Sequence, residues 1–230
     1  PLRPAIGQTL VAAARNIAPT SLDTWLAMDA SGNVTAFFGK MDMGQGVDTA
    51  VAQVVAEELD VPVARVSVMM GDTALTPNQG GASGSSACRL GANALRNAAA
   101  EARRVLLERA GRQFGVAADA LRVVDGHIHR EGTSAALTSY AQLIADGFDT
   151  ALEWNSQQGN NMSVRGAART KSPAEYRVVG TGVARKDIPG KILATTEYCH
   201  HVRLPGMWHG RAVRPPVAGA VPVSVDEASI

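Results

Sequence analysis

Two glycine-rich segments carry the residues most able to do chemistry. The first is the stretch Met43–Gly46, "MGQG", and the second is Ser83–Ser86, "SGSS". Glycines lack a Cβ and let backbone amides approach a ligand closely. A glutamine between two of them can both donate and accept hydrogen bonds, and serine hydroxyls suit phosphate oxygens. The two segments therefore predict loops that bind a polar or anionic ligand.

Each segment leads into a predicted helix, whose first amides have no partner within the helix and favour anions. A glycine-rich turn is more often only a turn, but two in successive units strengthen the prediction. Asp42 and Asp48 flank the first segment and argue against a bare phosphate there, so a larger, partly uncharged ligand fits it better. A third glycine at dinucleotide-fingerprint spacing and a Gly-Lys-Ser/Thr ending are both absent, which disfavours a generic nucleotide-binding domain.

Other side chains give weaker signals. His127 and His129 alternate along a predicted strand without a carboxylate or cysteine at metal-ligand spacing, which favours surface histidines. Cys88 precedes a helix, where its pKa could be lowered, but a buried small hydrophobic residue is the favoured interpretation. Glu57 and Glu58 are interpreted as solvated or structural. No nucleophile–base pair is evident, so no catalytic residue and no direct metal ligand are predicted in this chain.

The elements that position the two segments follow from hydrophobic periodicity. A short apolar run predicts a strand at Val34–Gly39, and apolar positions on one face predict a helix at Val47–Leu59. A second strand is predicted around Arg65–Met70, and an alanine-rich helix from Leu90 to about Ala110. Two strand–loop–helix units in sequence indicate a mixed α/β (α+β) fold.

The remainder of the chain predicts smaller elements. "LRVVDGHIHR" reads as a hairpin with a two-residue Asp-Gly turn, and a short helix follows with Thr138 or Ser139 as its N-cap. Residues from about Asn155 to Lys171 are polar and predict a linker. After them, short strands broken by glycine and proline are expected.

Composition limits the function classes. A chain of 230 residues is long enough for one large domain or two small ones. A formal charge of +1, without a basic cluster and with 4% aromatic residues, excludes a typical nucleic-acid surface. No apolar run approaches the roughly 20 residues of a membrane span. The two cysteines are too few for a disulfide framework or a zinc site.

The stretch from "GKMDMGQGVDTAVAQVVAEEL" through "GGASGSSACRLGANALRNAAAEAR" resembles the molybdopterin-binding region of the xanthine dehydrogenase/aldehyde oxidase family of molybdenum hydroxylases. Within that family it is most similar to the large, β-type subunits of isoquinoline 1-oxidoreductase, nicotinate dehydrogenase and related aldehyde dehydrogenase-like enzymes. "LPGM" and "VRPP" resemble the start of the family's hammerhead domain. The resemblance implies part of a molybdopterin-binding domain over residues 1–165 and an incomplete hammerhead-like domain over residues 166–230.

The resemblance also implies a cofactor and its contacts. In the family the two loops approach a molybdenum-bearing molybdopterin, carried in bacteria usually as the cytosine dinucleotide. Gln45 is then the expected side-chain hydrogen bonder. One serine of the family pattern falls on Ala87. The positions that match are Met43, Gly44, Gln45 and Gly46 in the first loop and Ser83, Gly84, Ser85 and Ser86 in the second.

Departures from the family pattern limit what this chain can do alone. The Gly-Gly-Gly-Phe-Gly loop and the glutamate that acts as general base are absent, and His200 stands where an acidic residue is common. The chain alone is therefore expected to be inactive. It is interpreted as the N-terminal portion of a large subunit whose complete form oxidises an aldehyde or hydroxylates an aromatic N-heterocycle with oxygen from water. The alternative is a non-catalytic cofactor-binding or assembly module of the same origin.

The family also suggests partners and a location. We expect the remainder of the large subunit, a small subunit with [2Fe-2S] clusters and, in some members, a cytochrome c subunit with haem. A start like "PLRPAIGQTL" often follows a twin-arginine signal in this branch, which favours the periplasm over the cytoplasm. The choice between aldehyde and N-heterocycle stays open because substrate-binding segments are not among these residues.

Overall fold

The computed structural model describes residues 17–145 and 147–229. The chain divides into two units, residues 1–186 and 187–230, and each is described by itself. The opening decapeptide on which the export expectation rests lies outside the described residues. No helix among those described is both long and apolar enough to cross a membrane.

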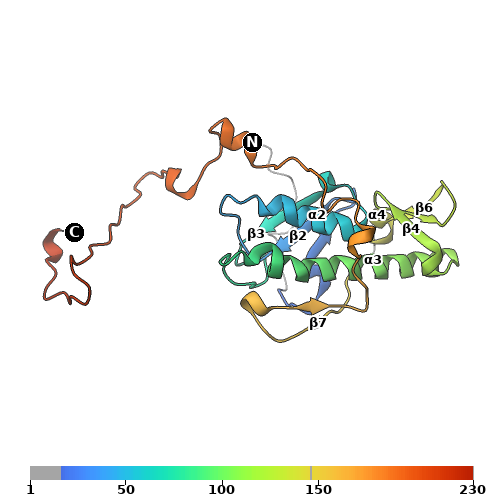
Figure 1. Ribbon diagram of the computed structural model, residues 1–230, viewed down its shortest axis with the longest axis horizontal. Coiled ribbons are helices and arrows are strands. Elements are labelled where there is room, and N and C mark those ends of the chain that lie inside the picture. The colour runs from blue at the N-terminus through green and yellow to red at the C-terminus, as the bar shows by residue number, and fades with distance from the viewer. Residues whose placement is uncertain (1–16, 146, 230) are drawn as a thin grey trace. The chain divides into compact units, whose positions relative to one another are not determined.

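The first unit is built on a three-stranded sheet with a crossover helix (Figure 1). Strand β1 (Leu26–Met28) runs antiparallel to β2 (Val34–Phe38), and β2 pairs in parallel with β3 (Val66–Met70). Helix α2 (Val47–Leu59) connects the two parallel strands. All five residues of β2 are buried, as expected for a central strand covered on both faces. The predicted strand, helix and second strand are confirmed.

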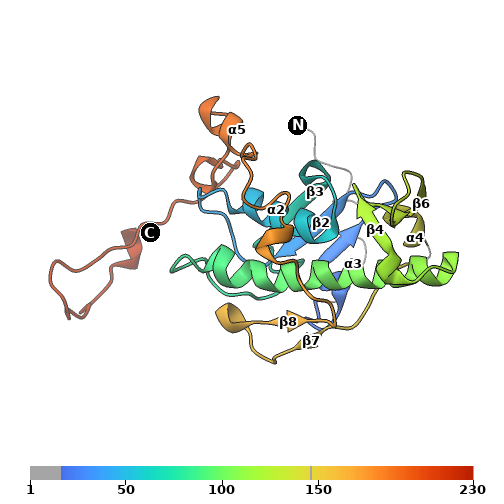
Figure 2. The ribbon, with the colours of Figure 1, turned by 45° about the vertical axis from the view of Figure 1, so that its right-hand side comes forward.

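Helix α3 (Ala92–Phe114) packs beside α2, as both ribbon views show (Figures 1 and 2). One turn of π-helix, η3 (Ala87–Gly91), precedes it, so that the second glycine-rich loop enters the helix through a widened turn. Ala98, Ala99 and Ala102 are buried, and their small side chains permit close helix packing. The predicted alanine-rich helix is confirmed, and so is the mixed α/β fold class.

A second sheet lies farther along the chain. It contains β4 (Leu121–Val124), β5 (His127–Arg130) and β6 (Ala136–Ser139), paired antiparallel in that order. The predicted Asp-Gly turn joins β4 to β5 with positive φ at both residues, 52° and 77°. Ser139, rather than Thr138, caps helix α4 (Tyr140–Leu143) in a capping box with Gln142.

The predicted linker around residues 155–171 is wrong. Strands β7 (Glu153–Trp154) and β8 (Val164–Arg165) pair antiparallel, and the 3-10 turn η5 (Gly159–Asn161) lies between them. Met162 and Val164 are buried in the hydrophobic core, although the surrounding composition is polar. These two apolar side chains anchor the segment in the core of the first unit.

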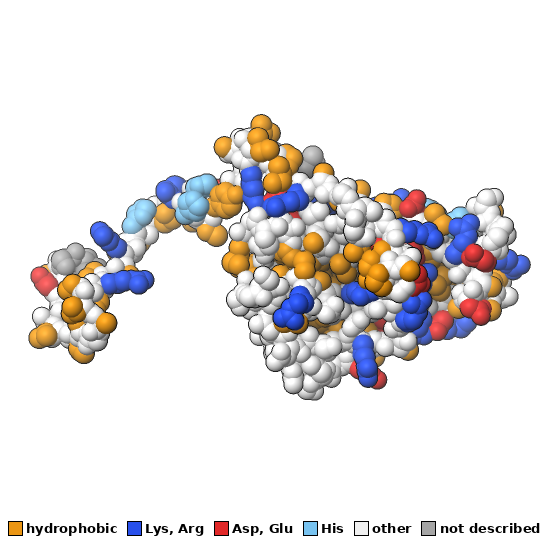
Figure 3. All heavy atoms as spheres, in the orientation of Figure 1, with side chains coloured by type: hydrophobic (Ala, Val, Ile, Leu, Met, Phe, Trp, Pro, Cys, Tyr) orange, Lys and Arg blue, Asp and Glu red, His pale blue; other side chains and the backbone are white. Residues whose placement is uncertain are grey.

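The second unit differs in kind. Its regular elements are helix α5 (Ile188–Ile192) and 3-10 turns at Cys199–His201 and Glu227–Ser229. The expected strands after residue 171 are wrong, because residues 172–229 contain none. Apolar side chains are exposed along this unit, with Trp208 at 92% and Val213 at 95% (Figure 3). Strands need a hydrogen-bonding neighbour, and the described chain supplies none here. The hammerhead assignment stays a prediction.

Candidate functional site

The first loop is closed largely by its own side chains. It runs from the end of β2 to Gly46, the N-cap residue of α2, which has a φ of 73°. The Asp42 carboxylate accepts hydrogen bonds from the amides of Gly44 (2.6 Å), Gly46 (3.3 Å) and Asp48 (3.5 Å). The expectation of unpaired amides at the start of this helix is thus wrong. Burial by itself raises the pKa of the Asp42 carboxyl. The hydrogen bonds from these amides together outweigh that effect, so the pKa lies below its ordinary value.

Gln45 folds back onto the same loop. Its Oε1 accepts from the Met43 amide at 2.6 Å, and its Nε2 reaches the Met41 carbonyl oxygen at 3.5 Å. Both Gln45 and Met43 are exposed. The Nε2 contact is the weaker of the two, at the long limit of a hydrogen bond. The role of Gln45 in ligand contact stays a prediction.

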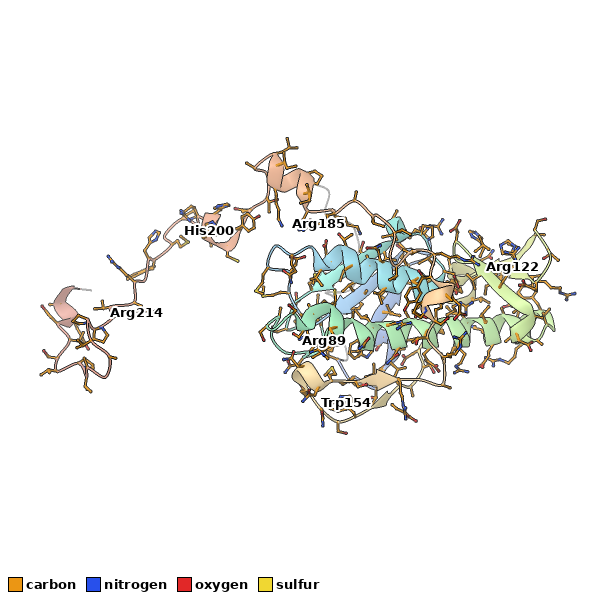
Figure 4. All side chains as sticks on the ribbon, viewed as in Figure 1. Arg89, Arg122, Trp154, Arg185, His200 and Arg214 are labelled. Atoms are coloured by element: carbon orange, nitrogen blue, oxygen red, sulfur yellow. The ribbon has the colours of Figure 1, made fainter. Side chains whose placement is uncertain are left out.

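A distant arginine braces this loop. Arg185, labelled in Figure 4, donates from Nη2 to the Gly44 carbonyl oxygen at 2.9 Å. A Cβ added at Gly46 would lie 2.3 Å from Arg185 Nε. Gly46 is therefore favoured by its positive φ, and a side chain there would displace the flexible guanidinium of Arg185 from its place beside the loop. Sequence reasoning missed Arg185, because the 141 residues that separate it from Gly44 leave no local signal.

The second loop is held from beneath by two buried side chains. Lys40, 1% exposed, donates from Nζ to the Gly81 carbonyl oxygen (2.9 Å), Ser86 Oγ (3.3 Å) and Asn160 Oδ1. Gln79, also 1% exposed, accepts from the Gly39 amide at 2.9 Å and donates to the Gly91 carbonyl oxygen at 2.8 Å. These contacts tie the loop to the residues just after strand β2 and to the turn just before helix α3. Neither residue was singled out from the sequence.

Two glycines permit the contact between the loops. A Cβ at Gly39 would lie 1.8 Å from the carbonyl oxygen of Pro77, which is backbone and cannot swing aside. A Cβ at Gly91 would lie 2.9 Å from both Lys40 Cδ and the Phe38 ring. These glycines are thus explained by the packing of the two loops on each other.

The two loops meet at one cleft of about 260 Å³. Of the eight predicted residues, four line it and four lie outside its lining. The four outside are Met43, Gly44, Ser83 and Gly84, all exposed. The lining consists of Gln45, Gly46, Val47, Ala50, Ala82, Ser85, Ser86, Ala87 and Cys88.

The chemistry of this lining suits a polar ring system that carries an anionic group. Small residues, Gly46, Ala50 and Ala82 among them, leave room for a flat ligand. The Gln45 amide and the hydroxyls of Ser85 and Ser86 supply neutral donors and acceptors. A cleft of this size accommodates a small ligand or part of a larger one.

Cys88 and the histidines do not add a catalytic group. Cys88 is exposed at the cleft, so its assignment as a buried hydrophobic residue is wrong. Partial desolvation raises the pKa of its thiol, the opposite of an activated thiolate. His127 and His129 are on β5, outside the cleft lining. Within the described ranges, no group of three histidine, cysteine or carboxylate side chains could hold a metal ion.

Buried carboxylates on α2 tie the helix to the segment that leads to Arg185. Glu57, 2% exposed, accepts hydrogen bonds at one oxygen, Oε2, from the amides of residues 177, 178 and 179, at 2.9, 2.7 and 2.9 Å. Burial by itself raises the pKa of the Glu57 carboxyl. The three amides and the Lys171 ammonium together outweigh that effect, so the pKa lies below its ordinary value. Glu58, also 2% exposed, pairs with Arg96 at 2.8 Å. The structural interpretation of both glutamates is confirmed, and we call this set of contacts the α2 clamp.

Comparison with protein families adds an independent finding. A model of the molybdopterin cofactor-binding domain matches residues 4–188. Over 212 residues the chain is 38% identical to the B subunit of nicotinate dehydrogenase from Pseudomonas putida, covering 90% of this chain and 17% of that protein. Over 242 residues it is 31% identical to the beta subunit of isoquinoline 1-oxidoreductase from Brevundimonas diminuta, covering 92% and 31%. The chain thus spans less than a third of these curated relatives.

A solved structure supports the fold. Reconstituted CO dehydrogenase from Oligotropha carboxidovorans superposes with a TM-score of 0.50 at 21% identity. The match covers 60% of this chain and 18% of that one. At this identity the likeness concerns the fold alone.

Proposed function

This chain belongs to the molybdopterin cofactor-binding domain family, and from that premise we propose that the cleft between its two loops binds the molybdenum cofactor of a hydroxylase large subunit. The observation that carries the proposal is the convergence of two segments about 40 residues apart on a single cleft. Gln45 and Gly46 line it from one side, and Ser85 and Ser86 from the other. The four residues are predicted cofactor contacts, and a lining of small, mostly apolar side chains with a few neutral polar groups fits the ligand.

The residues divide the work of binding. Gly46 and the alanines of the lining provide a surface on which a flat ring can lie. Ser85 and Ser86 line the same space, and their hydroxyls suit the phosphate-bearing part, which we propose to be the cytosine dinucleotide. Gln45 orients the ring edge through its amide. When bound, the cofactor supplies two-electron redox chemistry and activation of water.

The complete protein, on this proposal, oxidises an aldehyde or hydroxylates an aromatic N-heterocycle and passes electrons to partner subunits. An iron–sulfur subunit and, in some assemblies, a cytochrome c subunit are the proposed acceptors. Two relatives named as subunits support an assembly of several chains. Residues 187–230 are proposed as the start of the hammerhead domain, and the periplasm as the location.

Expression of the complete large subunit with its partners tests the proposal. We expect molybdenum and a pterin in the purified complex, and we expect both to be lost in Gly46→Val, which puts a branched side chain into the cleft lining at a position of positive φ. A matched control is Gly132→Val, in a hairpin with open space around it and a similar positive φ of 77°. Normal molybdenum in Gly46→Val at normal yield would contradict the assignment. A loaded complex that oxidises no aldehyde or heterocycle would favour the non-catalytic alternative.

A further inference from the structure

Among the residues that the structure describes, Lys40 is a buried cation without a counter-charge. Its side chain is 1% exposed, and its Nζ contacts three neutral oxygens. Throughout the described ranges 17–145 and 147–229, no carboxylate forms an ion pair with it. An ammonium removed from water without an anion is costly, which makes such a group rare in a protein core. Burial lowers the pKa of Lys40 below its ordinary value, while three acceptor oxygens match the three N–H donors of its ammonium directly behind the second loop.

Ser86 connects that charge to the cleft. Lys40 Nζ donates to Ser86 Oγ, so a lone pair of the hydroxyl is occupied and its proton remains to be given. The acceptor it has in this structure is the Gly81 carbonyl oxygen at 3.4 Å, which already accepts from Lys40 at 2.9 Å. The hydroxyl is thus weakly engaged, and Ser86 lines the cleft. A stronger acceptor placed there would take the proton.

We propose that Lys40 is a positioning residue that, through Ser86, makes this wall of the cleft a donor for an anionic oxygen of the phosphate class. The inference rests on the proposed function and assigns the phosphate-bearing end of the ligand to the second loop. The first loop has the opposite character, because Asp42 places a carboxylate among its amides. Charge thus orients the ligand, with its anionic end toward Lys40 and its uncharged ring toward Gln45.

The packing around Lys40 supports a dedicated role. Gly91 leaves space for the lysine stem, since a Cβ there would lie 2.9 Å from Lys40 Cδ. Asn160, from the turn between β7 and β8, holds the ammonium from a third direction. Segments around residues 40, 81–91 and 160 therefore converge on one charged group that reaches no solvent.

The test uses the complete subunit with its partners and four variants: Lys40→Met, Ser86→Ala, the double variant, and Lys191→Met as a control with the same charge change in the second unit. Molybdenum and released cytosine nucleotide are measured per polypeptide, together with the rate of cofactor release at low and high salt. We expect Lys40→Met and Ser86→Ala each to release the cofactor about tenfold faster, equivalent to about 1.4 kcal/mol. The double variant should match the singles, because both act through one chain of hydrogen bonds.

A second readout separates positioning from mere stability. Pyrophosphate should raise the melting temperature of cofactor-free unmutated protein and of Lys191→Met, but not that of Lys40→Met. If Lys40→Met does not fold, Ser86→Ala carries the same expectation. Salt should speed release from the unmutated complex more than from Lys40→Met, since the charge is what salt screens.

Three results would each overturn the proposed role of Lys40. A loaded unmutated complex whose Lys40→Met and Ser86→Ala variants retain cofactor and respond to pyrophosphate would overturn the role of Lys40 and leave the proposed function standing. An unmutated complex without molybdenum would overturn the proposed function and this inference with it. Faster release with unchanged salt and pyrophosphate responses would show a structural role only and also reject the inference.

Discussion

The two loops of the cleft are held in place by different means. The first is closed by residues inside it, with Asp42 on three amides and Gln45 on a fourth. The second is held by Lys40 and Gln79, whose partners come from three other segments. The first loop is therefore closed mainly by local contacts, with Arg185 as a distant brace, whereas the second depends more on partners elsewhere in the fold. Substitutions in the two loops should consequently fail in different ways.

The largest effect is expected where the loops touch through backbone. Gly39→Val places a side chain on the Pro77 carbonyl oxygen, and a Cβ alone would lie 1.8 Å away. We expect the free energy of unfolding to fall by more than about 3 kcal/mol, as for severe overpacking. Urea denaturation of the complete subunit measures it. Gly81→Ala, with no atom within 4 Å of the added Cβ, is the control and should change little.

Asp42 tests the local closure of the first loop. Asp42→Ala removes the acceptor of three amides and should cost about 2 kcal/mol, near the upper end for helix caps. Asp42→Asn keeps one oxygen acceptor and should cost about half as much. Thermal denaturation compares the variants. Equal stability of Asp42→Ala and the unmutated protein would show that water replaces the carboxylate.

The serines test the second loop by ligand occupancy. Ser85→Ala with Ser86→Ala should lower molybdenum content about tenfold, because two donors to a charged group are lost. The fraction that stays loaded should turn over normally. Ser83→Ala is the matched control, since Ser83 does not line the cleft. Loss of molybdenum in the control as well would mean that the whole loop, rather than its inner wall, binds.

The pH dependence of stability should reveal Asp42. Its pKa in the folded protein lies below the ordinary value of 3.8, so its carboxylate stabilises the fold fully above that value. The contribution is lost as the pH falls through the folded pKa. The stability difference between the unmutated protein and Asp42→Asn should therefore be constant from pH 7 to about pH 5 and shrink below about pH 3.8. If the stability difference instead grew as the pH fell, the pKa of Asp42 in the folded protein would lie above its ordinary value, and the prediction would be wrong.

The smallest effect is expected at Gln45. Gln45→Ala removes one neutral contact worth about 0.5–1.5 kcal/mol, too little to release a ligand held at many points. Molybdenum content should stay the same while turnover per molybdenum falls. If Gln45→Ala empties the site and the serine variant stays full, the assignment of ring and anion to the two loops is reversed.

The same contrast explains what could be predicted. Strand β2, helix α2 and the Asp-Gly hairpin follow from local periodicity and turn chemistry, and the structure confirms them. The position of both glycine-rich loops between a strand and a helix was predictable for the same reason. Lys40, Gln79 and Arg185 were not, since their partners lie across the fold.

The errors have the same origin. The segment 155–171 has the polar composition of a linker, yet Met162 and Val164 reach the core. Conversely, apolar runs after residue 187 have the composition of strands, but no described neighbour pairs with them. In both segments the structure depends on whether another part of the chain packs against the segment or pairs with it, and the composition of the segment does not show this.

The α2 clamp has a consequence for biosynthesis. The three amides that satisfy Glu57 lie 120 to 122 residues later in the chain. At a synthesis rate of about 5–20 residues per second, the helix waits between about 6 and 24 s for them to be made. Until then the Glu57 carboxylate lacks these three donors. The nascent chain therefore finishes this unit late, and a ribosome that pauses before residue 177 would hold it unfinished, with the first loop formed and Arg185 not yet there to brace it.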